Sequence, residues 1–250
     1  MRIIAFIPAR YDSSRFPGKP LIPIADKPMI QHVYEQAEAC PEISEVFVAT
    51  DDERIARCVR NFGGKTVMTG RDHPSGTDRI AEAASLVDLE DEVLVVNIQG
   101  DQPTFEHRCI PHLVRPLRVE RNLLMSTLVF RMTEDHEVKD LKNVKTVWDK
   151  DGFALFFSRA PIPFYRDSGS ERVYYKHLGF YAYRRGFLKT FASLPVGKWE
   201  DAEKLEQLRA IEYGYRIKIV DSPCDSFEVD TPSDVKVAER ILAERKAGRR

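Results

Sequence analysis

The sequence lacks an excess of either charge and lacks any paired-cysteine motif. Its 250 residues contain 38 Lys plus Arg against 39 Asp plus Glu, so no net field draws the chain to nucleic acid or to an anionic membrane. The four cysteines form no CxxC pair, which disfavours a zinc site or a redox dithiol and suits a reducing cytosol. Any phosphate-binding site must therefore rest on a local group of cations.

Long hydrophobic runs are also missing. The N-terminus has a six-residue apolar stretch that ends at Pro8, which is too short for a signal peptide or a membrane span. We therefore expect a cytoplasmic protein with no membrane partner. The 43% hydrophobic content is enough to bury a substantial core, as one domain or as two tightly joined lobes.

In the first half, apolar runs alternate with helical patterns. Residues 3–7 and 93–98 are continuous apolar runs, typical of strands that are covered on both faces, and 45–50 predicts another strand. Apolar residues recur at helical spacing between 30 and 37, and 52–62 predicts a second helix. We predict an α/β fold with a doubly wound, mostly parallel (Rossmann-like) sheet.

The second half has a different pattern. Strands are predicted at 123–130 and 174–183, and a hairpin is predicted around the turn Asp149–Gly152. A helix is expected from about Asp201 to Tyr213, and Thr231, Pro232 and Asp234 have the spacing that begins a last helix. We therefore expect a smaller, partly antiparallel part after the parallel sheet.

The loop after the first strand carries three cations. It reads RYDSSRFPGKP and contains Arg10, Arg15 and Lys19. Ligands of open α/β sheets bind beyond the carboxyl ends of the strands, so this loop and Asp101, after the third strand, should share one rim. The loop matches neither a Walker motif nor GxGxxG. A polyanion site is predicted, with a solvated basic loop as the alternative.

Several ordered strings resemble one family nearly from end to end. They include PARYDSSRFPGKPL, VATDD, HPSGTDRIAE, NIQGDQP, SRAPIP, YKHLGFYAY, EKLEQLR and FEVDTPSD. The chain resembles the CMP-sugar synthetases, in particular the 3-deoxy-manno-octulosonate cytidylyltransferases. The resemblance implies transfer of CMP from CTP to 3-deoxy-D-manno-octulosonate (Kdo), releasing pyrophosphate, for lipopolysaccharide biosynthesis. It also implies Mg²⁺ as cofactor and a homodimer formed around residues 150–185.

The resemblance also implies site residues. Lys19, Asp101 and Arg15 are the expected catalytic residues, and Mg²⁺ is expected on Asp101 and Asp230, since Mg²⁺ takes carboxylate oxygens. The expected nucleotide-binding residues are Ala9, Arg10, Arg15, Lys19, Ser75, Gly76, Arg79 and Gln99. The expected sugar-binding residues are Arg159, His177, Tyr181, Glu206 and Gln207. Correspondingly, 1–122 should be mainly nucleotide-binding, 123–225 mainly for the sugar and dimerisation, and 226–250 should supply the metal aspartate and a helix of the same domain.

Structural alternatives exist for several of these residues. Ser75 could simply cap a helix, His177 could be a packed strand residue, and Asp230 could cap a turn without excluding a metal. Gln102 stands where the family string QGDEP has a glutamate, which puts metal binding there in doubt. The sequence leaves open Kdo or its 8-amino-3,8-dideoxy analogue as the acceptor.

Three other functions fit the sequence less well. A sialic acid cytidylyltransferase shares the basic loop, but the KHLG and EQLR strings disfavour it. A non-catalytic nucleotide-binding module is disfavoured by the joint presence of Lys19, Asp101 and Asp230. A glycosyltransferase is less favoured still, because QGD offers one aspartate where DxD offers two. No nucleophile and base pair is visible, so direct in-line attack on the α-phosphorus is expected, driven by positioning and charge.

Overall fold

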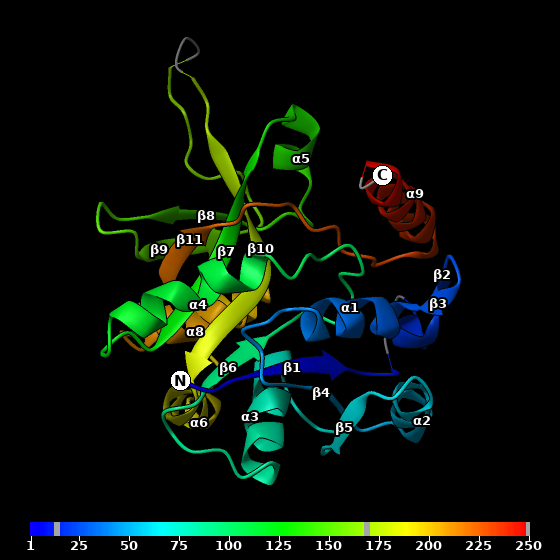
Figure 1. Ribbon diagram of the computed structural model, residues 1–250. Helices are drawn as coiled ribbons and strands as arrows, with labels where there is room; N and C mark the ends of the chain where they lie inside the picture. Colours follow the sequence, from blue (N-terminus) through cyan, green and yellow to red (C-terminus); the bar gives the residue numbers. More distant parts are fainter. Residues whose placement is uncertain (13–15, 168–170, 249–250) are drawn as a thin grey trace.

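A nine-stranded sheet organises the chain, and its first half is parallel. The computed structural model describes residues 1–12, 16–167 and 171–248. The parallel strands are β1 (Ile3–Ala9), β4 (Glu45–Thr50), β5 (Lys65–Met68) and β6 (Leu94–Asn97). The helices among them are α1 (Met29–Glu38), α2 (Glu53–Asn61) and α3 (Gly76–Leu86). The predicted alternation of strands and helices, and with it the fold class, is confirmed (Figure 1).

The second half continues the same sheet with a strand of opposite direction. Strand β10 (Tyr174–Arg184) lies between β6 and β7 (Met125–Met132) and is antiparallel to both. Strand β11 (Lys218–Asp221) is parallel to β7. Strands β8 (Lys145–Trp148) and β9 (Ala154–Ser158) form an antiparallel hairpin, and the predicted turn connects them. The sheet therefore runs without a break through the predicted nucleotide and sugar regions.

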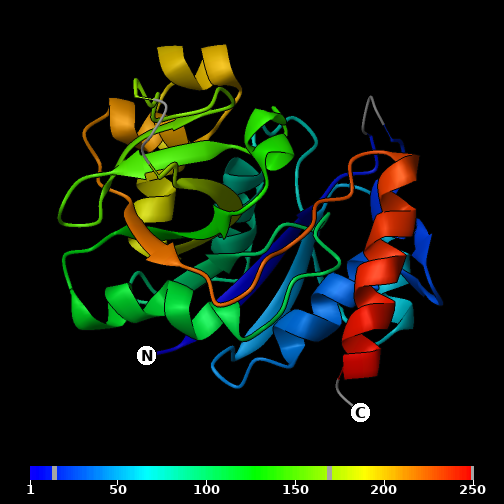
Figure 2. The same cartoon turned by 90° about the horizontal axis from the view of Figure 1, so that it is seen from above.

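The remaining elements include the last helix, α9, which is the longest of the described helices. They are η1 (Lys19–Leu21), the pair β2 (Pro23–Ile24) and β3 (Lys27–Pro28), α4 (Cys109–Val119), α5 (Asp135–Lys139), α6 (Arg185–Ser193), α7 (Lys198–Glu203), α8 (Gln207–Glu212) and α9 (Pro232–Gly248). Helix α9 begins as predicted, and the Asp234 carboxylate accepts a hydrogen bond from Thr231 N (2.8 Å). It lies beside the β2–β3 pair, at the end of the molecule away from the β8–β9 hairpin (Figure 2).

The single helix expected from Asp201 to Tyr213 is wrong, because the chain breaks there into α7 and α8. Lys204 adopts a left-handed conformation (φ 55°) and ends α7. The next amide, Leu205 N, bonds back to Glu200 O (3.2 Å), and Leu205 is buried. The break turns the chain so that Glu206 and Gln207 begin a new helix at the edge of the sheet.

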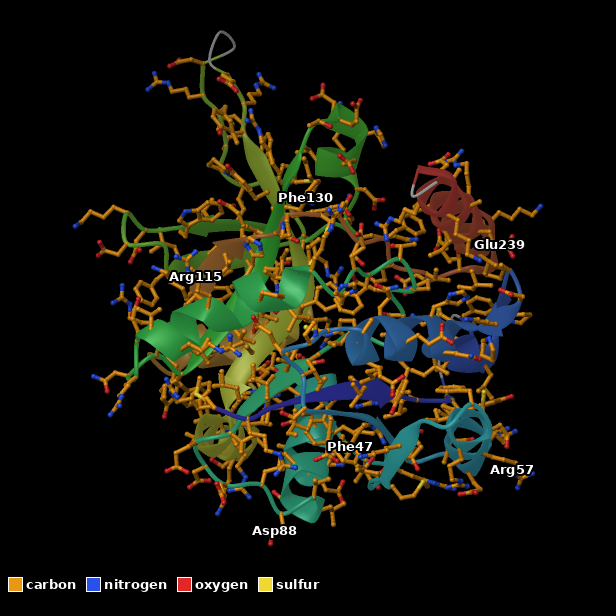
Figure 3. The ribbon with its side chains drawn as sticks, in the orientation of Figure 1. Phe47, Arg57, Asp88, Arg115, Phe130 and Glu239 are labelled. Carbon is orange, nitrogen blue, oxygen red and sulfur yellow. The ribbon has the colours of Figure 1, made fainter. Side chains whose placement is uncertain are left out.

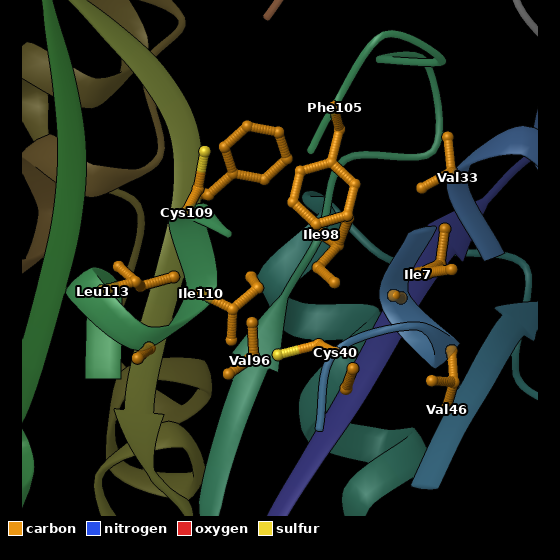
Figure 4. Packing of buried hydrophobic residues seen from close by; sticks show 14 of the residues in the cluster. Ile7, Val33, Cys40, Val46, Val96, Ile98, Phe105, Cys109, Ile110 and Leu113 are labelled. Atoms are coloured by element: carbon orange, nitrogen blue, oxygen red, sulfur yellow. The ribbon is translucent and has the colours of Figure 1, made fainter. Parts of the chain in front are cut away.

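Two apolar cores cover the two faces of the sheet. Alternate residues of β1 point to opposite faces, so Ile3, Ala5 and Ile7 join one core, whereas Ile4 and Phe6 join the other. In the first core, Val33 of α1 and Ile110 and Leu113 of α4 lie over Ile7, Val96 and Ile98 of the sheet region (Figure 4). Helices α3 and α6 cover the second face.

Charged side chains such as Arg57 of α2 and Asp88 after α3 point outward (Figure 3). None of the described helices is long and apolar enough to cross a membrane.

Cys109 and Cys224 are both buried free thiols, and their Sγ atoms lie 2.9 Å apart. Their separation in the sequence gave no indication of this contact.

Candidate active site

A pocket of about 900 Å³ opens at the carboxyl ends of the parallel strands. Ala9 and Thr50 pair at the ends of β1 and β4, and Asn97 ends β6, so the loops that follow all leave from one edge. Strand β10 runs antiparallel, with Tyr181 opposite Asn97, and therefore brings residues 177–181 to the same edge. The predicted site residues that line the pocket are Ser75, Gly76, Gln99, Asp101, Arg159, His177, Tyr181, Glu206, Gln207 and Asp230.

Lys19 joins the two predicted metal ligands. Its Nζ donates to Asp101 Oδ2 (2.8 Å) and to Asp230 Oδ1 (3.2 Å). The side chains of Lys19 and Asp230 are only 14% and 8% exposed. Burial works to lower the pKa of Lys19, but attraction to Asp101, the Asp101 hydrogen bond and the charges of Asp230 and Glu228 outweigh it, so the pKa is raised. Lys19 is therefore a fixed cation at this edge of the sheet.

A third carboxylate completes an acidic cluster. Oxygens of Asp101, Glu228 and Asp230 all lie within 4.8 Å of one another. The backbone holds the two segments together, since Val229 N donates to Asp101 O (2.9 Å). Desolvation and the charges of Asp101 and Asp230 raise the pKa of Glu228 to about 8. Glu228 retains an exposed surface, so repulsion by the two neighbouring aspartates is the main cause of this raised pKa.

The cluster fits a hard divalent cation. Three carboxylates within reach of one point are the donor set that Mg²⁺ takes, with phosphate oxygens or water at its other positions. Glu228 was missed in the sequence analysis, although it stands two residues before Asp230 in FEVDTPSD. In extended chain, residues two apart face the same side. That spacing was the available signal.

Ser75 caps a helix and also lines the pocket. Its Oγ accepts from Asp78 N (3.2 Å) as the N-cap of α3 and donates to Asp78 Oδ2 (2.6 Å), and it also lines the pocket. The first turn of α3 thus faces the pocket with the positive end of its dipole, which favours an anion. Gln99 also lines the pocket, and its Nε2 donates to Gly179 O (2.8 Å).

Four predicted nucleotide ligands do not line the pocket. Ala9 is buried at the end of β1, and Arg10 Nη2 donates to His73 O (2.6 Å) and Ser75 O (3.1 Å), holding the loop before α3. Arg79 is fully buried, and its Nη1 contacts Asp51 (2.9 Å) and Thr69 Oγ1 (2.6 Å). The fourth, Lys19, contacts the pocket aspartates. Arg15 lies outside the described residues.

Among the residues predicted to bind the sugar, His177 is held as a neutral imidazole. Its Nε2 lies 2.9 Å from Thr127 Oγ1, and burial lowers its pKa to about 3. Gln207 lies 3.5 Å from His177 Nδ1, and Gln207 Oε1 accepts from Tyr181 OH (3.1 Å). The hydroxyl of Thr127 was missed from the sequence. His177, Tyr181 and Gln207 thus form a neutral hydrogen-bonding wall of the pocket, with Thr127 behind His177.

Glu206 and Arg159 already have protein partners. Glu206 accepts from Thr77 N (3.2 Å) and Thr77 Oγ1 (2.6 Å). Arg159 Nε donates to Glu203 O (2.9 Å) and Nη1 to Leu141 O (3.1 Å). Within the described residues, Nη2 of Arg159 makes no hydrogen bond, and a guanidinium has five N–H donors in all. A planar anion can therefore still bind this side chain.

Gln102, which stands where the family string QGDEP has a glutamate, has a structural role that its amide group makes possible. It is 6% exposed, and its Nε2 donates to Leu178 O (2.7 Å). A glutamate carboxylate could not donate this bond. Gln102 thus holds β10 beside the pocket, and its amide adds no carboxylate to the cluster of Asp101, Glu228 and Asp230.

Residues 4–219 match the cytidylyltransferase family. The chain belongs to the cytidylyltransferase family. Among cytidylyltransferases, it is 52% identical over 241 residues to 3-deoxy-manno-octulosonate cytidylyltransferase of Syntrophus aciditrophicus, covering 96% of this chain and 97% of the relative. It is 54% identical over 244 residues to 8-amino-3,8-dideoxy-manno-octulosonate cytidylyltransferase of Shewanella sediminis, covering 97% and 99%.

A solved structure supports the same family. CMP:2-keto-3-deoxy-manno-octonic acid synthetase, complexed with CTP, superposes with a TM-score of 0.90 at 40% identity, covering 98% of this chain and all of that one. The cytidylyltransferase fold is thus shared over nearly the whole chain.

Proposed function

We propose that the protein transfers CMP from CTP to 3-deoxy-D-manno-octulosonate, forming CMP-Kdo and pyrophosphate. One observation carries the proposal: Lys19 and the acidic cluster of Asp101, Glu228 and Asp230 adjoin the same pocket as Arg159 and the hydrogen-bonding wall. A triphosphate and a sugar acid are the two ligands that such a pocket can hold together. The relatives at 52% and 54% identity are named for this sugar and its 8-amino analogue.

Chemistry at the pocket requires no covalent intermediate. The anomeric hydroxyl of the sugar attacks the α-phosphorus in line, the bond from that phosphorus to the bridging oxygen breaks, pyrophosphate leaves and the hydroxyl proton passes to water. Lys19 offers a positive charge to the departing pyrophosphate, as does Arg15 in the proposal. Mg²⁺, when bound by Asp101 and Asp230, supplies charge neutralisation and polarisation of the phosphoryl oxygen. Positioning and charge supply the rate in such transfers.

The acceptor is bound by complementary groups. Arg159 offers N–H donors to the sugar carboxylate, since guanidinium and carboxylate form strong paired bonds. His177, Tyr181 and Gln207 present donors and acceptors to hydroxyls, and the neutral state of His177 allows one ring nitrogen to accept. In the proposal, Gln99, Ser75 and Gly76, which line the same pocket, contact the nucleotide.

A homodimer belongs to the same proposal. Two large apolar side chains in the segment 150–185 are exposed, Phe164 at 88% and Leu155 at 56%. Exposed apolar side chains of this size favour burial against a second copy. Light scattering after size exclusion is expected to give a molar mass of twice the chain mass. In Phe164→Asp, the measured mass should shift toward that of a single chain. A monomeric wild type would overturn the dimer. The proposed place of the enzyme is the cytoplasm, in lipopolysaccharide biosynthesis.

A substrate panel tests the activity. Pyrophosphate release is measured for CTP and other nucleoside triphosphates crossed with Kdo, its 8-amino analogue and sialic acid, with Mg²⁺. Release is expected with CTP and an octulosonate, and Asp101→Asn serves as the inactive control. The ratio of kcat/KM for the two octulosonates identifies the acceptor. Release only with sialic acid, or none with any sugar acid, would contradict the proposal.

A further inference from the structure

Two contacts join the first turn of α3 on the nucleotide side to α8 on the acceptor side. The first runs from α8 to α3: the Glu206 carboxylate, at the start of α8, accepts from Thr77 N (3.2 Å) and Thr77 Oγ1 (2.6 Å). Thr77 is fully buried. Glu206 therefore pairs one of the backbone amides in the first turn of α3 that have no partner inside the helix. A helix N-terminus favours such a carboxylate.

The second contact runs in the opposite direction. Asp78 on α3 accepts from Arg209 on α8, with Nη1 to Oδ1 at 3.0 Å. Glu200 accepts two further bonds from Arg209, at 2.8 Å from Nε and 2.6 Å from Nη2. The side chains of Arg209 and Asp78 are 1% and 7% exposed. Removing one partner of a buried ion pair leaves an unpaired buried charge, so this contact is costly to break.

Both contacts end on residues next to the pocket. The Oδ2 atom of Asp78 accepts from Ser75 Oγ (2.6 Å), so Arg209 fixes the carboxylate that orients Ser75. On the other side, Arg209 is two residues from Gln207, which bonds Tyr181 and lies next to His177. Ser75 and Gln207 both line the pocket. The distance between the two halves of the pocket is thus set through Asp78–Arg209 and Thr77–Glu206, which we call the α3–α8 clasp.

We propose that the α3–α8 clasp aligns the acceptor hydroxyl with the α-phosphorus, and that Asp78, Arg209 and Thr77 are positioning residues of the reaction. The inference rests on the proposed function, because it needs two substrates in one pocket. Each substrate still has its own contacts when the clasp is loosened, so binding changes little. The attack depends on alignment of the two substrates, and a misplacement of about 1 Å can cost about 100-fold in rate.

Steady-state kinetics of Asp78→Asn test this inference. This change keeps the side-chain shape and removes the charge that faces Arg209. We expect kcat to fall about 10- to 100-fold, while the KM values for CTP and for the sugar change by less than about threefold. Thr77→Val, which removes the hydroxyl bonded to Glu206, provides a second variant in case Asp78→Asn folds poorly. It should show the same split between kcat and KM.

The matched control is Asp91→Asn. It removes the carboxylate partner of Arg185 (2.6 Å) far from the pocket and should leave both kcat and KM unchanged. Thermal unfolding of every variant gives the folded fraction at the assay temperature, and Asp78→Glu, which restores a carboxylate, should recover part of kcat.

An unchanged kcat in Asp78→Asn and Thr77→Val, once corrected for folded fraction, would overturn the inference and leave the proposed function intact. A loss expressed only as a higher KM would also overturn it. Wild-type protein that releases no pyrophosphate with any sugar acid would instead overturn the proposed function, and the inference with it.

Discussion

Lys19 Nζ lies 2.8 Å from Asp101 Oδ2, which joins the first loop of the sheet to the acidic residue after β6. Asp230, from the segment before α9, completes the contact at 3.2 Å. Three parts of the chain that are distant in sequence thus meet at one point. A cation next to a carboxylate cluster is the arrangement that can hold a metal and a triphosphate together.

Asp101→Asn should reduce turnover by about a thousandfold, by analogy with other lost electrostatic stabilisers. The amide keeps the size of the side chain but removes the charge beside Lys19 that would hold Mg²⁺. Pyrophosphate release at saturating Mg²⁺ measures the effect, and Asp149→Asn, in the β8–β9 hairpin where it pairs with Arg216, is the control. Near-normal turnover would remove Asp101 from the site.

Lys19→Ala should cause a loss of similar size, about a thousandfold, expressed in the chemical step. The reason is that a charge which follows the departing pyrophosphate stabilises the transition state more than bound CTP. Single-turnover kinetics separate the two effects. If only the KM for CTP rises, Lys19 is a ground-state anchor for the nucleotide.

Arg159→Ala should raise the KM for the sugar acid about 10- to 100-fold, because a hydrogen bond to a charged group contributes about 1.5–3 kcal/mol. The KM for CTP should stay unchanged. Arg159→Lys keeps the charge but loses the planar fork, so it should recover only part of the affinity. Equal effects on both KM values would show that Arg159 supports the fold of the pocket and does not bind the acceptor.

Burial lowers the pKa of His177 to about 3 from the ordinary 6.5. The free energy of unfolding should therefore depend on pH. The unfolded chain binds a proton there that the folded chain does not, so the contribution to stability is complete above the unfolded pKa and is lost as pH falls from 6.5 toward about 3. The melting temperature should therefore fall between about pH 7 and about pH 5. In His177→Asn the fall should be smaller, and an identical fall in both proteins would contradict the assignment.

Much of the fold was predictable because it depends on local patterns. The strand 45–50 and the hairpin turn at Asp149–Gly152 follow from apolar runs and turn residues. The break between α7 and α8 was not predictable, since Leu205 is buried by contacts made in the folded protein and Lys204 has no special preference for a left-handed conformation. Tertiary packing here overrides the helical pattern.

The site could be predicted in part. The carboxyl ends of parallel strands meet at one edge, which brought Asp101 toward the loop of Lys19. The burial of Arg79 and the bond from Arg10 to His73 O depend on side-chain packing that no string encodes. The assignment of the nucleotide to these two arginines thus stays a prediction, as do the roles given to the other site residues and to Mg²⁺.

The central claim is that a divalent ion held by Asp101 and Asp230 lies against the phosphates of CTP beside Lys19. A crystal structure with Mn²⁺ and a CTP analogue that cannot be cleaved between the α- and β-phosphorus tests it most directly. The account predicts an anomalous peak bonded to both aspartates and to a phosphate oxygen. A triphosphate bound elsewhere, with no ion between it and these carboxylates, would contradict the account.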